Sequence, residues 1–388
     1  MNENYKFDYR LGTIAQTQNW RTASGAIVAY EPYIREMRVW AHLFKQVDIF
    51  APLSTGEIRM TVSEYGFPNI DFELVSYSHS TRWWGAFVRF VQLPVVLLKL
   101  FLFVWKHEVL LIRSPSHLGL FAHIFVFLLG KKSITKYAGY FSFFEGERVP
   151  SIIERNFIRK ILRPPHFAMV YGPSEANHLI SFIPAAISMT EISTLKALRT
   201  EKIETREKII FYSLGKLIRV KDFDLAIDGL GLLFQENPAF NWEYHLIGDG
   251  PELNSLIERC EKYGISNRVN FHGKLSYNDA MRKLVSANVV IMPGRKEGWP
   301  KVIIESWAVG AVPLVVDVGI SSQIIKDGIN GFLFKPGPIP LRNRLKSIFD
   351  TKNHLQEIQK SGWEEVENFS IEKFEQGIEN ICREKLHL

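Results

Sequence analysis

The sequence predicts an α/β protein built from two doubly wound, Rossmann-like domains, each with a central parallel sheet. Short apolar segments alternate with longer amphipathic segments along the chain, which is typical of strands joined by helices. The 388 residues are also enough for two domains of ordinary size. We therefore expect two such domains that face each other across a cleft.

The alternation is most regular in the C-terminal half. Strands are expected at Lys208–Leu214, Glu243–Ile247, Val269–His272, Val289–Met292, Val312–Asp317 and Gly331–Phe334. Helices are expected at Asp222–Phe234, Pro251–Tyr263 and Tyr277–Ser286. In such sheets ligands bind at the carboxyl ends of the strands. Glycines follow several of these ends and either let backbone approach a ligand or simply form ordinary turns.

The N-terminal half alternates less regularly. Its strands are expected at Arg10–Ala15, Val47–Pro52, Glu73–Tyr77, Val109–Arg113, Ser133–Tyr137 and Met169–Tyr171. Its helices are expected at Tyr30–Phe44, Leu118–Leu129 and Ser151–Leu162. We place the first domain at residues 1–183, a charged linker at 184–206 and the second domain at 207–361. The amphipathic segment 362–388 is expected to be helical and to cross back to the first domain.

Composition sets wider bounds on compartment and partners. A chain with 46% hydrophobic and 23% charged residues is globular. Cys260 and Cys382 lack metal-ligand spacing, which argues against a zinc site or disulfide framework and fits a reducing compartment. The N-terminus has no apolar signal core, so we expect a cytoplasmic protein. The net charge of +6 indicates an anionic partner. No basic–aromatic motif supports nucleic acid.

The segment from Glu297 to Glu305 is the most informative part of the sequence. Its two carboxylates lie eight residues apart, on a predicted loop and the helix that follows. Pro300 suits the first helical position, so amides at this helix N-terminus would form a seat for an anion such as a pyrophosphate. The residues around this seat are Gly298, Trp299, Pro300, Lys301 and Val302. Two carboxylates beside a phosphate seat suit an enzyme that binds a nucleotide-sugar.

The segment Pro293 to Val316 resembles the retaining, nucleotide-sugar-dependent glycosyltransferases of family 4, which have the GT-B fold. The resemblance rests on two glutamates with seven residues between them, followed by a strand of the Pro-Val-Val type. Gly294 stands where the family has Ser. It implies that Glu297 is the catalytic contact to the transferred sugar and that Glu305 holds the ribose hydroxyls. The alternative interpretation is that both are solvated surface charges.

The turn Gly215 to Phe223 is similar to the family's phosphate-binding turn. The resemblance implies that Lys216 and Lys221 grip the donor pyrophosphate, with Lys216 in place of an Arg and Asp222 in place of a Gly. A solvated basic turn is the alternative. The resemblance also implies that Lys274 and Leu275 lie near the nucleotide base, and that Gly25 stands in for a phosphate loop unless it belongs to an ordinary loop.

The acceptor side departs from the family pattern. Ala138 stands where the family has a histidine that lines the active site. In the donor domain, Ile320 and Gln323 replace a Gly and a Glu, so the identity of the donor sugar does not follow from the resemblance. Arg113 and His117, after an earlier strand, are our candidates for holding the acceptor; a capping or surface role is the alternative for His117.

The apolar stretch Trp83–Trp105 has basic neighbours, and its uninterrupted apolar runs are shorter than the ~20 residues of a spanning helix. It fits either a helix buried on the N-terminal sheet or one that lies on an anionic membrane surface.

The resemblance implies transfer of a sugar, with retention and without metal or other cofactor, from a nucleotide diphosphate-sugar to a hydroxyl of a glycan or lipid-linked acceptor. It suggests cell-surface or lipid-linked polysaccharide synthesis on the inner face of the membrane. The alternatives are a nucleotide-sugar epimerase of the same fold and a non-catalytic partner.

Overall fold

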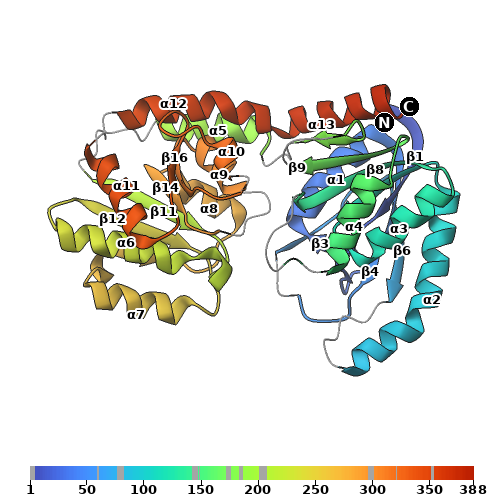
Figure 1. The fold of residues 1–388 in the computed structure, drawn as a ribbon, viewed down its shortest axis with the longest axis horizontal. Helices are drawn as coiled ribbons and strands as arrows, with labels where there is room; N and C mark the ends of the chain where they lie inside the picture. The colour runs from blue at the N-terminus through green and yellow to red at the C-terminus, as the bar shows by residue number, and fades with distance from the viewer. Residues whose placement is uncertain are drawn as a thin grey trace. The chain divides into compact units, whose positions relative to one another are not determined.

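The computed structural model describes residues 5–58, 61–76, 83–141, 147, 149–171, 176–182, 187–200, 208–295, 301–319, 321–350 and 354–388. The chain forms two compact units (Figure 1). Unit 1 contains Met1–Ile183 together with Phe374–Leu388, and unit 2 contains Pro184–Lys373. Both units are built on largely parallel sheets covered by helices, so the predicted α/β class is confirmed.

Unit 2 holds a fully parallel sheet whose strands fall where the sequence predicts them. The strands are β11 (Ile209–Leu214), β12 (Trp242–Ile247), β13 (Val269–Phe271), β14 (Val289–Met292), β15 (Val312–Val316) and β16 (Phe332–Phe334). Their order is β13-β12-β11-β14-β15-β16. This is the doubly wound order of a Rossmann domain, and it reverses between β11 and β14.

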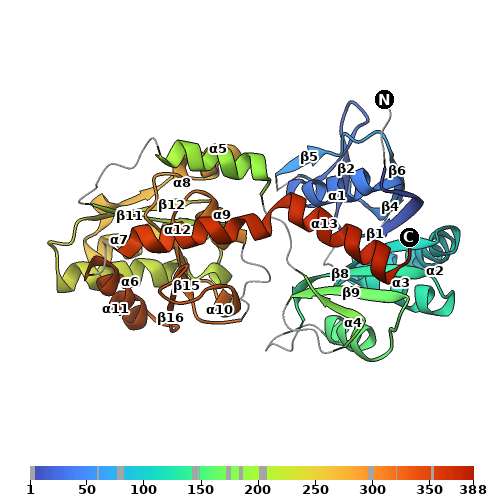
Figure 2. The ribbon, with the colours of Figure 1, turned by 90° about the horizontal axis from the view of Figure 1, so that it is seen from above.

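Helices cover both faces of this sheet (Figure 2). They are α5 (Met189–Thr200), α6 (Phe223–Glu236), α7 (Leu253–Tyr263), α8 (Tyr277–Leu284), α9 (Lys301–Ala308), α10 (Ser321–Ile324), α11 (Pro338–Asp350) and α12 (Leu355–Glu365). One core lies under α6, α7 and α11, and a second lies under α5, α8 and α9. Because both faces are covered, strands such as β14 are buried throughout and read as unbroken apolar runs.

The linker expected at 184–206 is not a plain linker, because part of it forms α5. Ile192 and Leu195 of this helix are buried in the core shared with α8 and α9. Ser188 and Glu191 bond to each other's backbone amides, which stabilises the first turn in the manner of a capping box. Of the charged residues on α5, Glu191 and Lys196 are half-buried, and Arg199 is buried and donates to the Ala287 carbonyl over 2.7 Å. Composition alone did not separate such a packed helix from a linker.

Unit 1 has a mixed sheet with the same doubly wound centre. Its strands are β1 (Phe7–Ile14), β2 (Asn19–Arg21), β3 (Ile27–Tyr30), β4 (Phe44–Leu53), β5 (Val62–Glu64), β6 (Ile70–Ser76), β7 (Val109–Ser114), β8 (Lys132–Tyr140), β9 (His166–Tyr171) and β10 (Leu179–Ser181). The parallel strands run in the order β6-β4-β1-β7-β8-β9-β10. The short strands β2, β3, β5 and β10 were not predicted; β3 pairs antiparallel with both β2 and β5.

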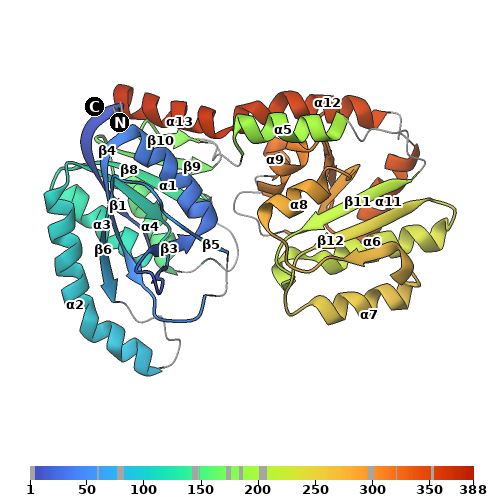
Figure 3. The ribbon, with the colours of Figure 1, turned by 180° about the vertical axis from the view of Figure 1, so that it is seen from behind.

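Two layers of helices enclose the sheet of unit 1 (Figure 3). The helices are α1 (Glu31–Leu43), α2 (Trp83–Lys106), α3 (His117–Leu128), α4 (Val149–Lys160) and α13 (Ile371–Asn380). The helices α2 and α3 share one core with strand residues such as Ile14 and Phe50. The helix α1 takes the opposite face, where its Glu36 contacts Arg113 of β7.

The C-terminal segment completes unit 1. Phe374 of α13 lies against Phe182, with 5.2 Å between ring centroids, and the Lys136 ammonium lies 5.4 Å from the Phe374 ring centroid. Ile378 is fully buried, as are Cys382 and Leu386 in the turns that follow. This segment is therefore part of the core of unit 1 and not an appendage.

Acid is expected to weaken unit 1 through His166. Burial lowers the pKa of His166 to about 4, and its Nδ1 lies 3.1 Å from the Ser133 hydroxyl. Since the unfolded chain binds this proton more readily, acidification below the ordinary His pKa of about 6.5 favours the unfolded state. The free energy of unfolding should fall by about 1 kcal/mol between about pH 7.5 and 5.5 through this group.

Urea unfolding of the wild type and His166→Gln at both pH values tests this. The variant should show about 1 kcal/mol less pH dependence. Identical pH dependence in the two proteins would mean that His166 does not carry the effect.

Candidate functional site

The candidate donor site lies where the strand order of unit 2 reverses, between β11 and β14. Phe211 pairs with Val289 and Tyr212 with Val290, and the buried Ser213 hydroxyl donates to the Ile291 carbonyl over 2.6 Å. The two loops that leave these strands are therefore neighbours. Such a reversal point is where doubly wound sheets bind ligands.

The loop after β11 carries the predicted cations. Lys216 is exposed and Lys221 is half-buried at the end of the 3-10 helix Arg219–Lys221, just before α6. Both belong to the turn that leaves a strand at the reversal point, as the sequence predicts. The structure thus places two lysines on the loop where an anionic ligand would be expected, and their role as phosphate contacts stays a prediction.

Glycines in this region serve contacts between turns. The Leu217 amide donates to the Asp249 carbonyl, and the Gly248 amide donates to the Gly273 carbonyl, each over 2.9 Å. A Cβ at Gly248 would lie 1.8 Å from the Gly215 carbonyl oxygen, and one at Gly250 would lie 2.3 Å from that of Leu217. These glycines are required because backbone meets backbone, a reason distinct from the ligand approach considered in the sequence analysis.

The loop after β14 leads into α9 and the predicted carboxylates. Glu297, Gly298, Trp299 and Pro300 lie outside the described residues. Lys301 and Val302 form the first turn of α9 and are half-buried. Glu305, one turn further, is 8% exposed, so it is not the helix-surface charge that the alternative interpretation required.

An ion pair that sequence reasoning missed joins the two loops. Arg295 contacts the Asp222 carboxylate, with 2.9 Å from Nε to Oδ2. Asp222 has a left-handed backbone (φ 49°), which explains why a Gly at this position is typical of the family it resembles. That conformation costs about 1 kcal/mol, and an exposed ion pair contributes about 0.2–1 kcal/mol, so the pair adds little net stability. The sequence signal at this position is an Asp directly before a predicted helix, and such an Asp predicts a helix N-cap and not an ion pair between two loops.

Lys274 and Leu275 follow β13 at the outer edge of the sheet. Lys274 is exposed, whereas Leu275 packs against the core under α8. His272 beside them stacks on His245, with 2.9 Å between Nε2 and Nδ1, which is an internal contact. The pair Lys274–Leu275 therefore lies two strands away from the reversal point.

In unit 1 the strand order reverses between β1 and β7, and His117 lies there. His117 is exposed at the first position of α3, and its amide donates to the Gln16 side chain over 2.9 Å. Arg113, in contrast, is turned inward. Its guanidinium is 2.9 Å from Glu36 and 4.6 Å from the centroid of the Tyr33 ring, and its side chain is 18% exposed.

A buried polar network that sequence reasoning missed supports the His117 turn. Glu154 of α4 accepts hydrogen bonds from the Ser114 hydroxyl over 2.6 Å and from the Ser116 amide over 2.7 Å. His123 Nε2 lies 3.0 Å from the same Ser114 hydroxyl. Since Glu154, which joins the network together, lies 40 residues after Ser114, no local pattern could have indicated it.

The remaining predicted positions are less informative. Gly25 is the exposed tip of the β2–β3 hairpin, where its φ of 86° explains a glycine. Ala138 lies in β8, and Gln323 is exposed on α10. Ile320 lies outside the described residues. In the part of the chain that the structure describes, no group of three or more His, Cys, Asp or Glu is arranged to hold a metal ion.

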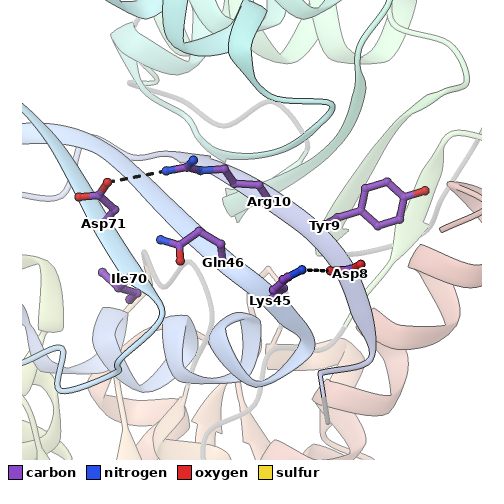
Figure 4. Close-up of a pocket in the computed structure, with 7 residues that line it drawn as sticks. All are labelled: Asp8, Tyr9, Arg10, Lys45, Gln46, Ile70 and Asp71. Atoms are coloured by element: carbon purple, nitrogen blue, oxygen red, sulfur yellow. Dashed lines mark ion pairs between the residues drawn. The ribbon is translucent and has the colours of Figure 1, made fainter. Parts of the chain in front are cut away.

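A surface hollow of about 850 Å³ lies near the amino ends of β1, β4 and β6, away from the reversal points. Figure 4 shows its charged lining, with Asp8 paired to Lys45 over 2.6 Å and Arg10 near Asp71. Arg10 also binds Asp48 over 2.6 Å. These charges pair with one another, so the hollow offers no excess of either sign to a charged ligand.

Comparison with known proteins matches most of unit 2 to one family. The model of the family described as glycosyl transferases group 1 matches residues 196–364. A lipopolysaccharide 1,6-galactosyltransferase of Salmonella typhimurium is 30% identical over 149 residues, which are 35% of this chain and 38% of that protein. The curated relatives align over less than two thirds of their own length.

Solved structures resemble the whole chain. A glycosyltransferase of Rickettsia africae has a TM-score of 0.69 at 14% identity, covering 98% of this chain and 99% of that chain. The Anabaena protein HepE, in complex with UDP and glucose, has a TM-score of 0.65 at 15% identity, covering 95% and 98%. The likeness confirms the predicted fold of two Rossmann-like domains, the GT-B fold.

Gly248→Ala should destabilise unit 2 by at least about 2 kcal/mol, because its methyl group would displace the Gly215 turn. Gly264→Ala is the matched control. Its φ is +68° with open space around the new Cβ, so it should cost about 1 kcal/mol. Urea unfolding measures both. Equal losses would show that turn-to-turn crowding is not what Gly248 avoids.

Proposed function

We propose that this chain transfers a sugar from a nucleotide diphosphate-sugar to an acceptor hydroxyl, because residues 196–364 match the model of the group 1 glycosyl transferases. One observation carries the proposal. The two loops at the strand-order reversal of unit 2 are those that hold Lys216 and Lys221 and that lead to Glu297. The cationic turn and the start of the loop that leads to α9 thus lie side by side where a doubly wound sheet binds its ligand, and we expect Glu297 to act there.

Each donor group has a distinct task in this proposal. Lys216, Lys221 and the amides at the start of α9 stabilise the diphosphate as its charge develops during departure. Glu297 orients the sugar at the reacting carbon. Glu305 binds the ribose hydroxyls, and its burial in α9 fits a fixed hydrogen-bond acceptor. Gly25 remains a further candidate for the phosphates, and Lys274 with Leu275 for the base.

The finer chemistry follows the same logic. We propose that the anomeric configuration is retained. We also propose that the lysines and the amides stabilise the departing diphosphate, as a divalent ion does in enzymes of other folds. The HepE structure holds UDP and glucose, so UDP-sugars are the first donors to test. Of the two acceptor-side candidates, His117 is exposed, so we assign it the contact with the acceptor. Arg113 is bound by Glu36, so we assign it a structural role on the acceptor side.

The two alternatives have less support. The family model that matches residues 196–364 and the Salmonella typhimurium relative both describe glycosyltransferases, which favours transfer over epimerisation. The retained Glu297 and buried Glu305 favour a catalytic protein over a non-catalytic partner.

Glu297→Gln should lower kcat for sugar transfer by about 100-fold, because the sugar loses the group that orients it. Glu305→Gln should raise the donor KM by about tenfold with little change in kcat, because ribose binding is lost equally in ground and transition state. Nucleotide release from a panel of nucleotide-sugars, with and without membrane lipid extract, measures both.

Glu258→Gln, on the exposed side of α7, is the control and should be unaffected. The transferase proposal fails if no nucleotide-sugar binds in calorimetry at high concentration. The role of Glu297 is wrong if Glu297→Gln releases nucleotide at the wild-type rate.

We also propose that unit 1 contacts an anionic membrane surface through α2. Apolar side chains spaced every three or four residues line the outer side of this helix. This α2 outer stripe consists of Val91, Val95, Leu98, Leu102 and Trp105, which are 46–63% exposed. A helix needs one apolar face to pack, and α2 already buries Leu100 and Phe103. A second apolar face toward solvent is typical of a contact surface.

The charges beside the α2 outer stripe complement an anionic bilayer. Lys99 and Lys106 project from α2, and Lys131 follows α3, where its Nζ donates to the Trp105 carbonyl over 2.6 Å. The exposed Phe127 and Leu128 extend the apolar area on α3. From residue 91 to 133 the sequence holds a single acidic residue, Glu108. Among the described helices none is long and apolar enough to span a membrane.

Such a surface suits an enzyme that works on a lipid-linked or surface glycan at the inner face of the membrane. The interfacial position buries the apolar stripe at the headgroup boundary, while each lysine gains about 1 kcal/mol from the anionic lipids. A basic, apolar face on the acceptor-side unit would bring the active site to its acceptor.

Leu98→Ser/Trp105→Ser should bind phosphatidylglycerol-containing vesicles at least about tenfold more weakly than the wild type in sedimentation. The control Ile329→Ser/Ile339→Ser removes equally exposed apolar residues from unit 2 and should bind normally. Wild-type binding should fall with salt and on neutral vesicles. A stripe that instead joins two copies would show as a dimer that the α2 variant dissociates, with no vesicle binding by either protein.

A further inference from the structure

Asp222 has a backbone conformation that disfavours its own side chain. It is the last residue before α6, with φ 49° and ψ 35°. Among the described residues other than glycine, His387 alone shares a positive φ. A glycine would adopt this conformation without strain. The carboxylate must therefore contribute something that a glycine cannot.

That contribution is not a helix cap. Asp directly before a helix commonly accepts a hydrogen bond from the first-turn amides, yet Asp222 makes no such bond to α6. Its carboxylate instead receives the Arg295 backbone amide at 3.3 Å, Nε at 2.9 Å and Nη2 at 3.3 Å. Because one contact is to backbone, the carboxylate fixes the course of the chain at Arg295 as well as its side chain.

The pair joins the two loops of the candidate donor site. Asp222 directly follows Lys221, and Arg295 precedes Glu297 by two residues. The strands before them, β11 and β14, are adjacent where the strand order reverses. The Asp222 side chain is 15% exposed, so its contacts are only partly screened by water, although Arg295 is 59% exposed.

We propose that Asp222 and Arg295 form a positioning pair that sets the loop leading to Glu297 in register with the Lys216–Lys221 turn. The inference rests on the proposed transferase function for its kinetic consequence. Since the strained backbone and the exposed ion pair largely offset each other in stability, the pair is explained by what it positions. Neither residue contacts the sugar in this proposal; both act through the loop.

Asp222→Gly separates positioning from folding. Glycine relaxes the backbone and removes the carboxylate, so the melting temperature should stay the same or rise while kcat falls at least about tenfold. The nucleoside diphosphate alone should bind with nearly unchanged affinity. Asp222→Asn keeps one acceptor oxygen and tolerates the left-handed backbone, so it should lose less activity than Asp222→Gly.

Arg295→Ala should reproduce the kinetic loss from the other side of the contact. The double variant Asp222→Gly/Arg295→Ala should be no slower than the worse single variant, because each removes the same interaction. Asp224→Asn, an exposed carboxylate in the next turn, is the matched control and should keep wild-type kcat. Multiplicative losses in the double variant would overturn a shared role.

A second measurement does not depend on catalysis. The Arg295 amide donates to Asp222, so its hydrogen exchange should accelerate in Asp222→Gly while exchange in β14 stays slow. Unchanged exchange at Arg295 together with unchanged kcat would refute the positioning pair. Faster exchange in a chain that transfers no sugar would support the pair and refute the proposed function.

Discussion

The parallel pairing of β11 with β14 is the constraint on which unit 2 depends. These strands are separated by two other strands in the sequence but are adjacent in the sheet. The chain leaves them toward opposite edges, so their loops meet with no strand between them. Ser213 reinforces the pairing by donating to Ile291. A cationic turn, a buried carboxylate in α9 and the Asp222–Arg295 pair are all brought together by this single adjacency.

The strands of unit 2 could be predicted from the sequence because each carries a strong local signal. A strand buried on both faces is an unbroken apolar run, and a glycine follows where the next turn approaches closely. The edge of unit 1 lacks such a signal. The strand β2 has three residues and is held by partners far away, such as Tyr65, whose hydroxyl donates to Asn19. Pairing of this kind cannot be deduced from neighbouring residues.

In the candidate site, too, some features could be predicted from local sequence and others could not. Lys216 and Lys221 could be placed because a strand, a glycine and a turn are consecutive in the chain. The ion pair of Arg113 could not be predicted, because its partner Glu36 lies on a helix many residues earlier in the chain. Glu36 also contacts Lys136. Local patterns thus locate a turn, whereas the partner of a charge depends on tertiary packing. The burial of Glu305 was likewise settled by packing alone.

The return of the chain to unit 1 has a consequence for protein synthesis. Phe374 and Ile378 fill the core of unit 1, whose residues before this C-terminal segment all lie before position 184. A ribosome makes all of unit 2 between these two contributions. Unit 1 therefore emerges first but completes its core last, and the surface that Phe182 offers to Phe374 stays uncovered while unit 2 is made. Unit 1 thus obtains its last core residues only after the whole of unit 2 has been synthesised.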